Sequence, residues 1–79
     1  MVSIHPGEYI RLILEDNHIS TNFFAEKSKL SLADVENLIN GKQDITPEIA
    51  HKLGVYFHNS ASFWLNLQKN YNGDLNDEN

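Results

Sequence analysis

Residues 20–41 decide the fold of this chain, and they read STNFFAEKSKLSLADVENLING. Ser20 and Ser31 are residue types that commonly cap helices, and each precedes a run of helically spaced apolar side chains. The connection between the two runs, residues 28–30, is short, and Ala25 offers the small side chain that two closely crossing helices require. The stretch therefore predicts a helix-turn-helix unit.

The second helix of this unit has the clearer signals at both of its ends. Asp34 lies three residues after Ser31, which matches the S-x-x-[DE] pattern of a capping box. Gly41 can end the helix because glycine adopts a left-handed backbone conformation without a steric penalty. The predicted inward face is apolar and consists of Val35, Leu38 and Ile39.

Helical patterns also precede and follow this unit. Pro6 suits the first position of a helix, where its missing N–H would have no partner anyway. Thr46 and Pro47 start a fourth helix, in which Gly54 costs about 1 kcal/mol relative to alanine. That cost is acceptable if another backbone packs against the glycine. Ser60 caps a fifth helix.

The sequence therefore predicts an all-α fold with five helices and no strands. Residues 1–72 are expected to form one helix-turn-helix domain. Residues 73–79 are polar and acidic, and we expect them to be a disordered tail. A chain of 79 residues leaves no room for a second domain.

Composition limits the possible functions. The absence of cysteine excludes disulfides and thiolate metal sites, which suits a reducing compartment. No stretch is long and apolar enough to suggest a membrane span or a signal peptide, so we expect a cytoplasmic protein without a membrane partner. Eleven acidic residues against six lysines and arginines give a net charge of −5. This balance is unusual for a DNA-binding domain, which commonly has a basic face.

Metal binding and catalysis are not supported by the residue pattern. The four histidines show no i, i+4 pair and are accompanied by no cysteine, so we predict no metal site. Serine and histidine residues do not form a catalytic arrangement, and a glycine-rich phosphate loop is absent. We predict no catalytic residue, no cofactor and no enzymatic activity.

Three motifs in this order resemble those of the HigA (VapI-type) antitoxins, within the lambda-repressor-like helix-turn-helix superfamily. They are His5-Pro6-Gly7-Glu8, Asn40-Gly41-Lys42 followed by Ile45-Thr46-Pro47, and Phe63-Trp64-Leu65-Asn66-Leu67-Gln68. The resemblance covers roughly residues 4–72. It implies a homodimer that neutralises a small basic toxin of the HigB/RelE type, which cleaves mRNA. It also implies that the antitoxin binds operator DNA and represses its own operon.

The helix-turn-helix geometry predicts which residues would contact DNA. A recognition helix reads base edges with residues near its N-terminus, while the preceding helix and flanking loops contact phosphates. The residues expected to face the bases are Leu32, Ala33, Asp34 and Asn37. The residues expected at phosphates are Thr21, Asn22, Lys29, Lys42 and Gln43, together with the helix N-terminus at Ser31. Simpler interpretations remain open. Asp34 could act only as the capping acid of its helix, and Asn37 could lie on an ordinary solvated face. Lys42 follows the C-terminus of a helix, where the helix dipole alone favours a cation.

The last helix carries more aromatic surface than a domain of this size can enclose. We therefore predict a dimer contact that consists of Phe63, Trp64, Leu67 and Tyr71. Two other functions remain open at this stage. The first is a stand-alone transcriptional repressor without a toxin, and the second is a protein-interaction module that has lost DNA binding.

Overall fold

The computed structural model describes residues 4–76. It contains five helices, which are α1 (Pro6–Asp16), α2 (Thr21–Ser28), α3 (Leu32–Ile39), α4 (Pro47–Phe57) and α5 (Ala61–Asn76). No strand occurs within residues 4–76. The prediction of an all-α, five-helix fold is therefore confirmed.

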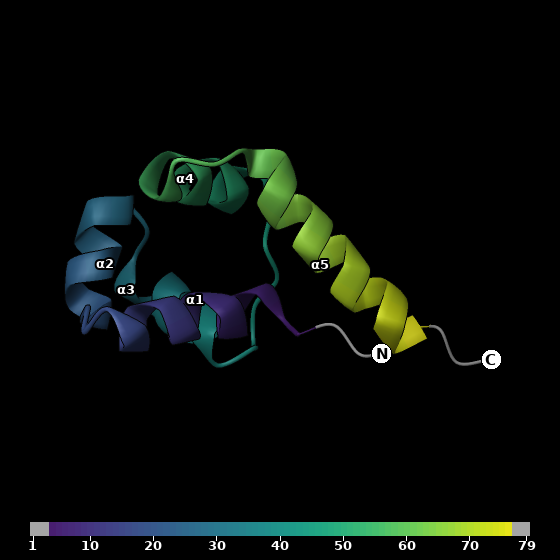
Figure 1. Cartoon of the computed structure of the whole chain (residues 1–79), viewed down its shortest axis with the longest axis horizontal. Coiled ribbons are helices and arrows are strands. Elements are labelled where there is room, and N and C mark those ends of the chain that lie inside the picture. The colour runs from purple at the N-terminus through teal and green to yellow at the C-terminus, as the bar shows by residue number, and fades with distance from the viewer. Residues whose placement is uncertain (1–3, 77–79) are drawn as a thin grey trace.

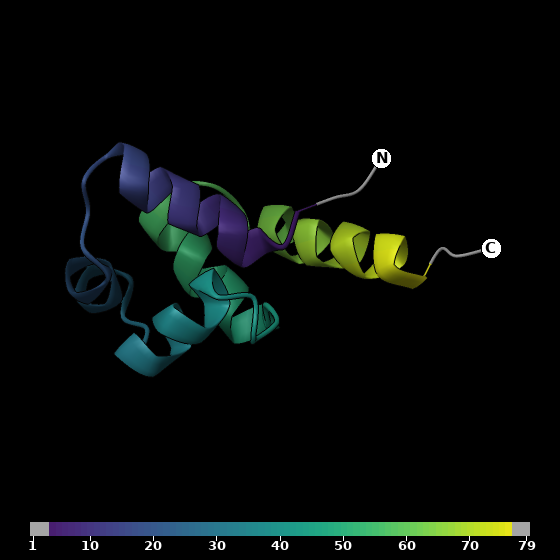
Figure 2. The same cartoon turned by 90° about the horizontal axis from the view of Figure 1, so that it is seen from below.

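The first four helices surround one core, and α5 extends from it. In Figure 1, α1 and α4 lie on opposite sides of the body, and α2 closes one end. α3 packs against α1 and α2, as the turned view in Figure 2 shows. α5 packs against α4 and α1 and then runs away from the body (Figure 1). The helix-turn-helix unit, α2 and α3, is thus supported by α1 and α4.

Capping side chains define where the helices begin. Four of them accept a hydrogen bond from the backbone N–H three residues later, as the sequence predicts, and these are Ser20, Ser31, Thr46 and Ser60. The cap of α1 is different, because His5 Nδ1 accepts a hydrogen bond of 2.9 Å from the N–H of Gly7. The sequence did not predict this histidine cap.

Left-handed residues end two of the helices and shape a third turn. Lys29 ends α2 with φ of 66°, and His58 ends α4 with φ of 61°. Gly41, just after α3, has φ of 71°, which confirms the predicted use of this glycine. Lysine and histidine adopt this conformation less readily than glycine. The backbone hydrogen bonds at Ala25 O and Gly54 O hold these two turns closed.

The core contains one apolar cluster contributed by every helix and by two connecting segments. Trp64 and Phe24 are its largest side chains, and both are fully buried. Ala25, at the expected crossing of α2, is also buried. The other members are Ile10, Leu14, Leu30, Val35, Leu38, Ile45, Ile49, Ala50 and Leu53.

Two glycines allow backbones to approach closely. A Cβ atom at Gly54 would lie 2.7 Å from the carbonyl oxygen of Asn59, so the segment after α4 packs against this point. This contact confirms the expectation that a backbone accounts for the glycine inside α4. At Gly7, a Cβ would lie 1.6 Å from the carbonyl oxygen of Leu38, which brings α1 against the end of α3.

The last helix extends further than the sequence predicts. We expected the domain to end at residue 72 and a disordered tail to follow, but α5 continues through Asn76. Residues 73–76 are therefore helical, which corrects the expectation of disorder for this part. Residues 77–79, the rest of the predicted tail, lie outside the described residues.

Candidate nucleic-acid interface

α3 has one face in the core and one face on the surface. Val35 and Leu38 are fully buried and set the rotation of the helix. The opposite side therefore faces outward, as the 3.6-residue period requires. The surface residues of this helix include the ones expected to face the bases: Leu32, Ala33 and Asn37 are exposed, and Asp34 is half-buried.

Asp34 uses its backbone and its side chain for two different contacts. Its N–H donates to Ser31 Oγ at 3.0 Å, so the serine half of the predicted capping box is present. Its carboxylate Oδ1 instead accepts a hydrogen bond of 3.1 Å from Gln43 Nε2. Asp34 therefore connects the start of α3 to the loop that follows the helix.

Gln43 also contacts Asn37, the other polar residue on this face. Asn37 Nδ2 donates to Gln43 Oε1 at 3.5 Å. A carboxamide nitrogen carries two hydrogens, so this contact leaves one N–H and the Oδ1 atom of Asn37 for another partner. Gln43 thus holds Asp34 and Asn37 in one cluster, the Asp34–Gln43–Asn37 cluster, at the surface of α3.

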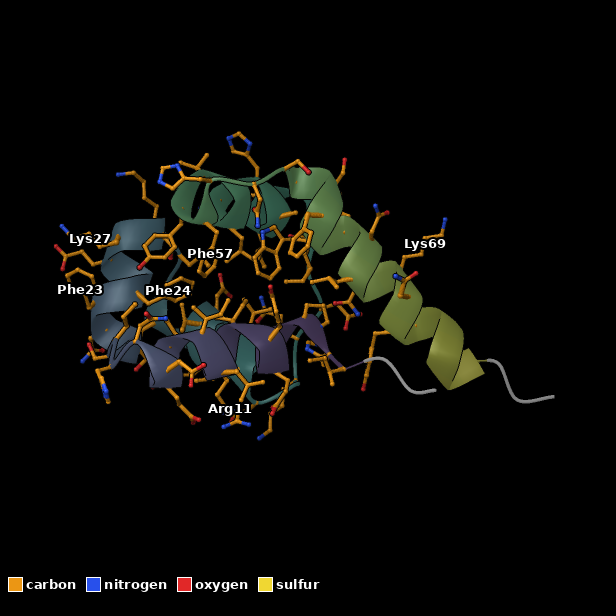
Figure 3. All side chains as sticks on the ribbon, viewed as in Figure 1. Arg11, Phe23, Phe24, Lys27, Phe57 and Lys69 are labelled. Carbon is orange, nitrogen blue, oxygen red and sulfur yellow. The ribbon has the colours of Figure 1, made fainter. Side chains whose placement is uncertain are left out.

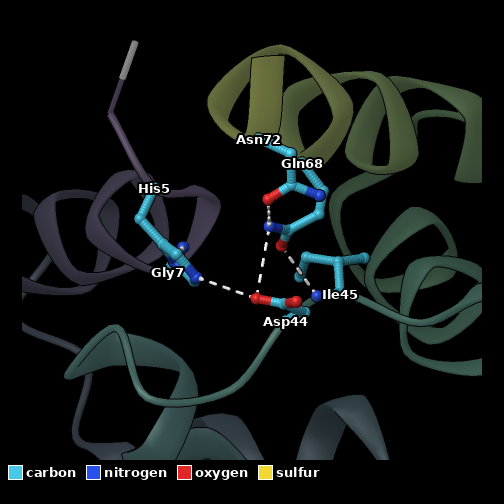
Figure 4. A network of polar contacts seen from close by, with 6 residues as sticks. All are labelled: His5, Gly7, Asp44, Ile45, Gln68 and Asn72. Atoms are coloured by element: carbon cyan, nitrogen blue, oxygen red, sulfur yellow. Dashed lines mark hydrogen bonds and ion pairs between the residues drawn. The ribbon is translucent and has the colours of Figure 1, made fainter. Parts of the chain in front are cut away.

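The loop that carries Gln43 is anchored to α5 (Figure 4). Gln68, which is buried, accepts a hydrogen bond of 2.8 Å from the N–H of Ile45 and donates one of 3.3 Å to Asp44 Oδ1. The buried His5 places its Nε2 atom 3.9 Å from the same carboxylate oxygen, and Asn72 Oδ1 accepts from Gln68 at 3.1 Å. The loop after α3 is therefore held from the α5 side as well as from the α3 side.

Sequence reasoning missed the anchoring roles of His5 and Gln68. One signal was available for Gln68, because it lies four residues after Trp64 and therefore on the same side of α5. A polar residue in an otherwise inward position indicates a buried hydrogen-bond partner. His5 had no such signal, since its partner Asp44 is distant in the sequence.

The expected phosphate contacts divide into two groups. Thr21 and Asn22 start α2, and Lys42 is exposed next to Gln43. Lys29 lies at the other end of α2, where its carbonyl oxygen accepts a hydrogen bond of 3.1 Å from Lys52 Nζ on α4. The structure therefore places the backbone of Lys29 beside α4.

The single arginine is occupied by two carboxylates of its own helix. Arg11 contacts Glu8, and its Nη1 lies 2.7 Å from Glu15 Oε2. The hydrogen bond from Arg11 lowers the pKa of the Glu8 carboxyl. Both contacts keep the guanidinium charge on the α1 surface, so lysines remain the cations for any nucleic-acid contact.

The residues predicted for the dimer contact differ in exposure. Trp64 is fully buried in the protomer, and its Nε1–H donates to Asn59 Oδ1 at 2.8 Å. A side chain without exposed surface cannot contact a second copy directly, so the assignment of Trp64 to a dimer interface is corrected. Phe63 is 37% exposed and lies beside Tyr9, which is 38% exposed. Leu67 and Tyr71 are half-buried.

Residues 4–76 were also compared with the requirements of a metal site and of a membrane-spanning helix. No group of three or more histidines or carboxylates that could hold a metal ion occurs in this part of the chain. None of its helices is both long and apolar enough to cross a membrane.

Comparison with known proteins identifies the family. No protein-family model matches the chain. An addiction-module antidote protein of the HigA family from Coxiella burnetii is 32% identical and superposes with a TM-score of 0.87, covering 95% of this chain and 83% of that one. The chain belongs to the HigA family of antitoxins. HigA-family antitoxins are not enzymes.

Two further relatives agree with this assignment. The antitoxin HigA of Pseudomonas aeruginosa, solved with the higBA promoter, is 38% identical with a TM-score of 0.81, over 87% of this chain and 76% of that one. The helix-turn-helix transcriptional regulator YddM of Escherichia coli K12 is 36% identical over 63 residues, which are 80% of this chain and 67% of that protein.

Proposed function

We propose that this HigA-family antitoxin binds the operator of its own operon as a homodimer, represses that operon, and neutralises a small basic toxin of the HigB/RelE type in the cytoplasm. The observation that supports DNA reading best is the Asp34–Gln43–Asn37 cluster on the outer face of α3. A related HigA antitoxin was solved with promoter DNA, which supports DNA binding as such.

Asn37 has the free groups that adenine recognition requires. Adenine presents an N6 amino donor and an N7 acceptor in the major groove, and an asparagine carboxamide can contact both at once. The contact with Gln43 leaves Oδ1 and one N–H of Asn37 available for this pair. Gln43 also restricts the rotation of the carboxamide, so less rotamer entropy is lost when DNA binds.

The net charge of −5 supports a basic protein partner. Opposite charge speeds association and favours the correct partner over others. The same charge disfavours DNA, so the proposed DNA affinity depends on few cations and on base contacts. For the second copy, Phe63 with Tyr9 supplies exposed aromatic surface, next to the half-buried Leu67 and Tyr71.

Asn37→Ala is expected to reduce operator binding by about 1–3 kcal/mol while leaving random-sequence DNA binding unchanged. The substitution removes a contact to a base, which only the operator offers, but it removes no charge, and charge is what attracts DNA of any sequence. Gel retardation with the protein's own promoter and with a scrambled duplex measures both values. Asn66→Ala, at an exposed asparagine on α5, is the matched control. An equal loss on both duplexes would contradict base reading by Asn37.

Lys42→Ala is expected to weaken binding to both duplexes alike and to make the slope of log K against log salt shallower by about 1. One fewer phosphate contact releases one fewer counterion. Affinities measured at several salt concentrations give the slope. Lys69→Ala is the control, because Lys69 is also exposed but lies on α5, outside the helix-turn-helix unit. A slope identical to that of the unchanged protein would remove Lys42 from the DNA contacts.

Co-expression with an adjacent reading frame for a small basic protein tests the toxin partner. We expect the two proteins to purify together and the antitoxin to restore growth. Operator binding without any such complex would favour a stand-alone repressor. A complex that forms while the promoter is never retarded, even at low salt, would favour a protein-interaction module.

A further inference from the structure

A cavity of about 290 Å³ lies between the C-terminal end of α2 and α4. In Figure 3, the labelled Lys27 lies at the end of α2 that approaches α4, with Phe23 further down the same helix. Thr21 and Asn22, the proposed DNA contacts of α2, are at the opposite end of the helix. The residues that line the cavity are Lys27, Ser28, Lys29, His51, Lys52, Val55 and Tyr56.

The floor of the cavity is apolar and well supported. Val55 is 65% exposed, the largest exposed fraction of any large apolar residue in the described part of the chain. The ring of Tyr56 is held edge-on by Phe24 and Phe57, with centroids 5.0 and 4.8 Å away. The bond between Lys52 Nζ and Lys29 O, 3.1 Å long, joins the two walls. These contacts hold the walls and the floor of the cavity in place.

The rim of the cavity is cationic, although the chain as a whole is acidic. Three of the six lysine and arginine side chains line it. Lys52 pairs with Glu48 at 3.5 Å, and Lys27 Nζ lies 5.5 Å from the centre of the Phe23 ring. Lys29 and His51 take part in none of the ion pairs found within residues 4–76. The rim thus keeps positive charge available for a ligand.

We propose that this cavity binds a small amphiphilic carboxylate, with its apolar body on Val55 and Tyr56 and its carboxylate beside Lys29 and Lys27. The apolar floor supplies hydrophobic contact, and the lysine ammonium groups supply charge-assisted hydrogen bonds. The volume is at the lower end of the range for ligand sites, about 300 Å³. It corresponds to a ligand with on the order of ten non-hydrogen atoms, at about 30 Å³ for each water-sized group.

An inorganic anion alone fits this site less well. Phosphate would contact the lysines, but it would leave the exposed surface of Val55 in water and gain nothing from the apolar floor. A DNA phosphate has the same disadvantage. The combination of one apolar floor and one cationic rim selects a ligand that carries both kinds of group.

An NMR titration of the whole chain with 3-phenylpropionate tests the proposal, and 3-phenylpropanol is the uncharged control. We expect saturable amide shifts within residues 27–29 and 51–56, with the acid bound about tenfold more tightly than the alcohol, which corresponds to 1.4 kcal/mol. Inorganic phosphate is expected to bind more weakly than the acid. Equal binding of acid and alcohol, phosphate binding as tight as that of the acid, or shifts spread over other surfaces would overturn the proposal.

Two variants make the assignment specific to these residues. Val55→Asp places a negative charge on the floor at an exposed position and is expected to abolish the shifts. Lys29→Asn, which keeps a residue tolerant of the left-handed backbone, is expected to weaken acid binding several-fold while leaving alcohol binding unchanged. Lys69→Gln is the charge-matched control and should have no effect. Circular dichroism confirms folding of each variant, and unchanged acid binding by a folded Val55→Asp protein would contradict the site. No DNA is present, so the outcome is independent of the proposed operator binding.

Discussion

Gly7→Ala is expected to remove most of the protein's stability at room temperature. The added Cβ would lie 1.6 Å from the carbonyl oxygen and 2.4 Å from the carbonyl carbon of Leu38. These are backbone atoms, which cannot rotate away as a side chain does, so α1 would have to move off α3. That movement opens the core around Ile10, which is fully buried. We expect a loss of about 4 kcal/mol or more, among the largest effects of a single substitution.

Such a loss approaches the whole stability of a small domain, which is of the order of 5–15 kcal/mol at most. Urea denaturation followed by circular dichroism measures it. Gly73→Ala is the matched control, because a Cβ at Gly73 meets nothing within 4 Å in α5. This control should stabilise the helix by about 0.5–1 kcal/mol. If Gly7→Ala were as stable as the unchanged protein, the close approach of α1 and α3 would be incorrect.

Trp64→Ala is expected to reduce the free energy of unfolding by about 3–5 kcal/mol. Its ring is fully buried and packs on Phe57, Tyr9 and Phe63, with centroid distances of 5.3, 5.7 and 5.1 Å. The substitution leaves a large cavity and also removes the donor that Asn59 accepts from. Thermal or urea denaturation of the variant measures the loss.

The neighbouring Phe63 separates folding from association. Phe63→Ser removes a side chain that is 37% exposed, so it should cost much less stability but reduce the mass seen by light scattering. For Trp64→Ala, the free energy of unfolding should fall by the same amount at any protein concentration, because the contacts that are lost lie within one protomer. If Trp64→Ala left the stability unchanged but halved the mass measured by light scattering, Trp64 would belong to the subunit interface after all.

Local signals in the sequence were sufficient for most of the fold. Ser20, Ser31 and Thr46 cap helices through contacts only three residues away, so the neighbouring sequence specifies them. Gly41 adopts its positive φ for a reason that is equally local. The apolar spacing of α3 placed Val35 and Leu38 inside, and this also determined which side of the helix faces outward. Leu32 and Asn37 are therefore exposed, as expected.

The candidate site was only partly accessible from sequence. The helical period predicts which residues of α3 are exposed, but it does not predict the contacts that these residues make with one another. Gln43 lies nine residues after Asp34, and its role depends on how the loop after α3 folds back on the helix. Lys29 shows the opposite case, because tertiary packing places it beside Lys52 on α4 at a cavity. Nothing in the spacing of lysines along the chain indicates that meeting.

By itself, the sequence determined where α2, α3, α4 and α5 begin, the side chains that cap them there and the outward face of α3, because these depend on residues within about one turn of each other. Only the tertiary structure decided that Trp64 is internal, that His5 and Gln68 reach one carboxylate, and that lysines gather over Val55. Such contacts join residues far apart in the chain. They depend on how the helices pack, which no local pattern specifies.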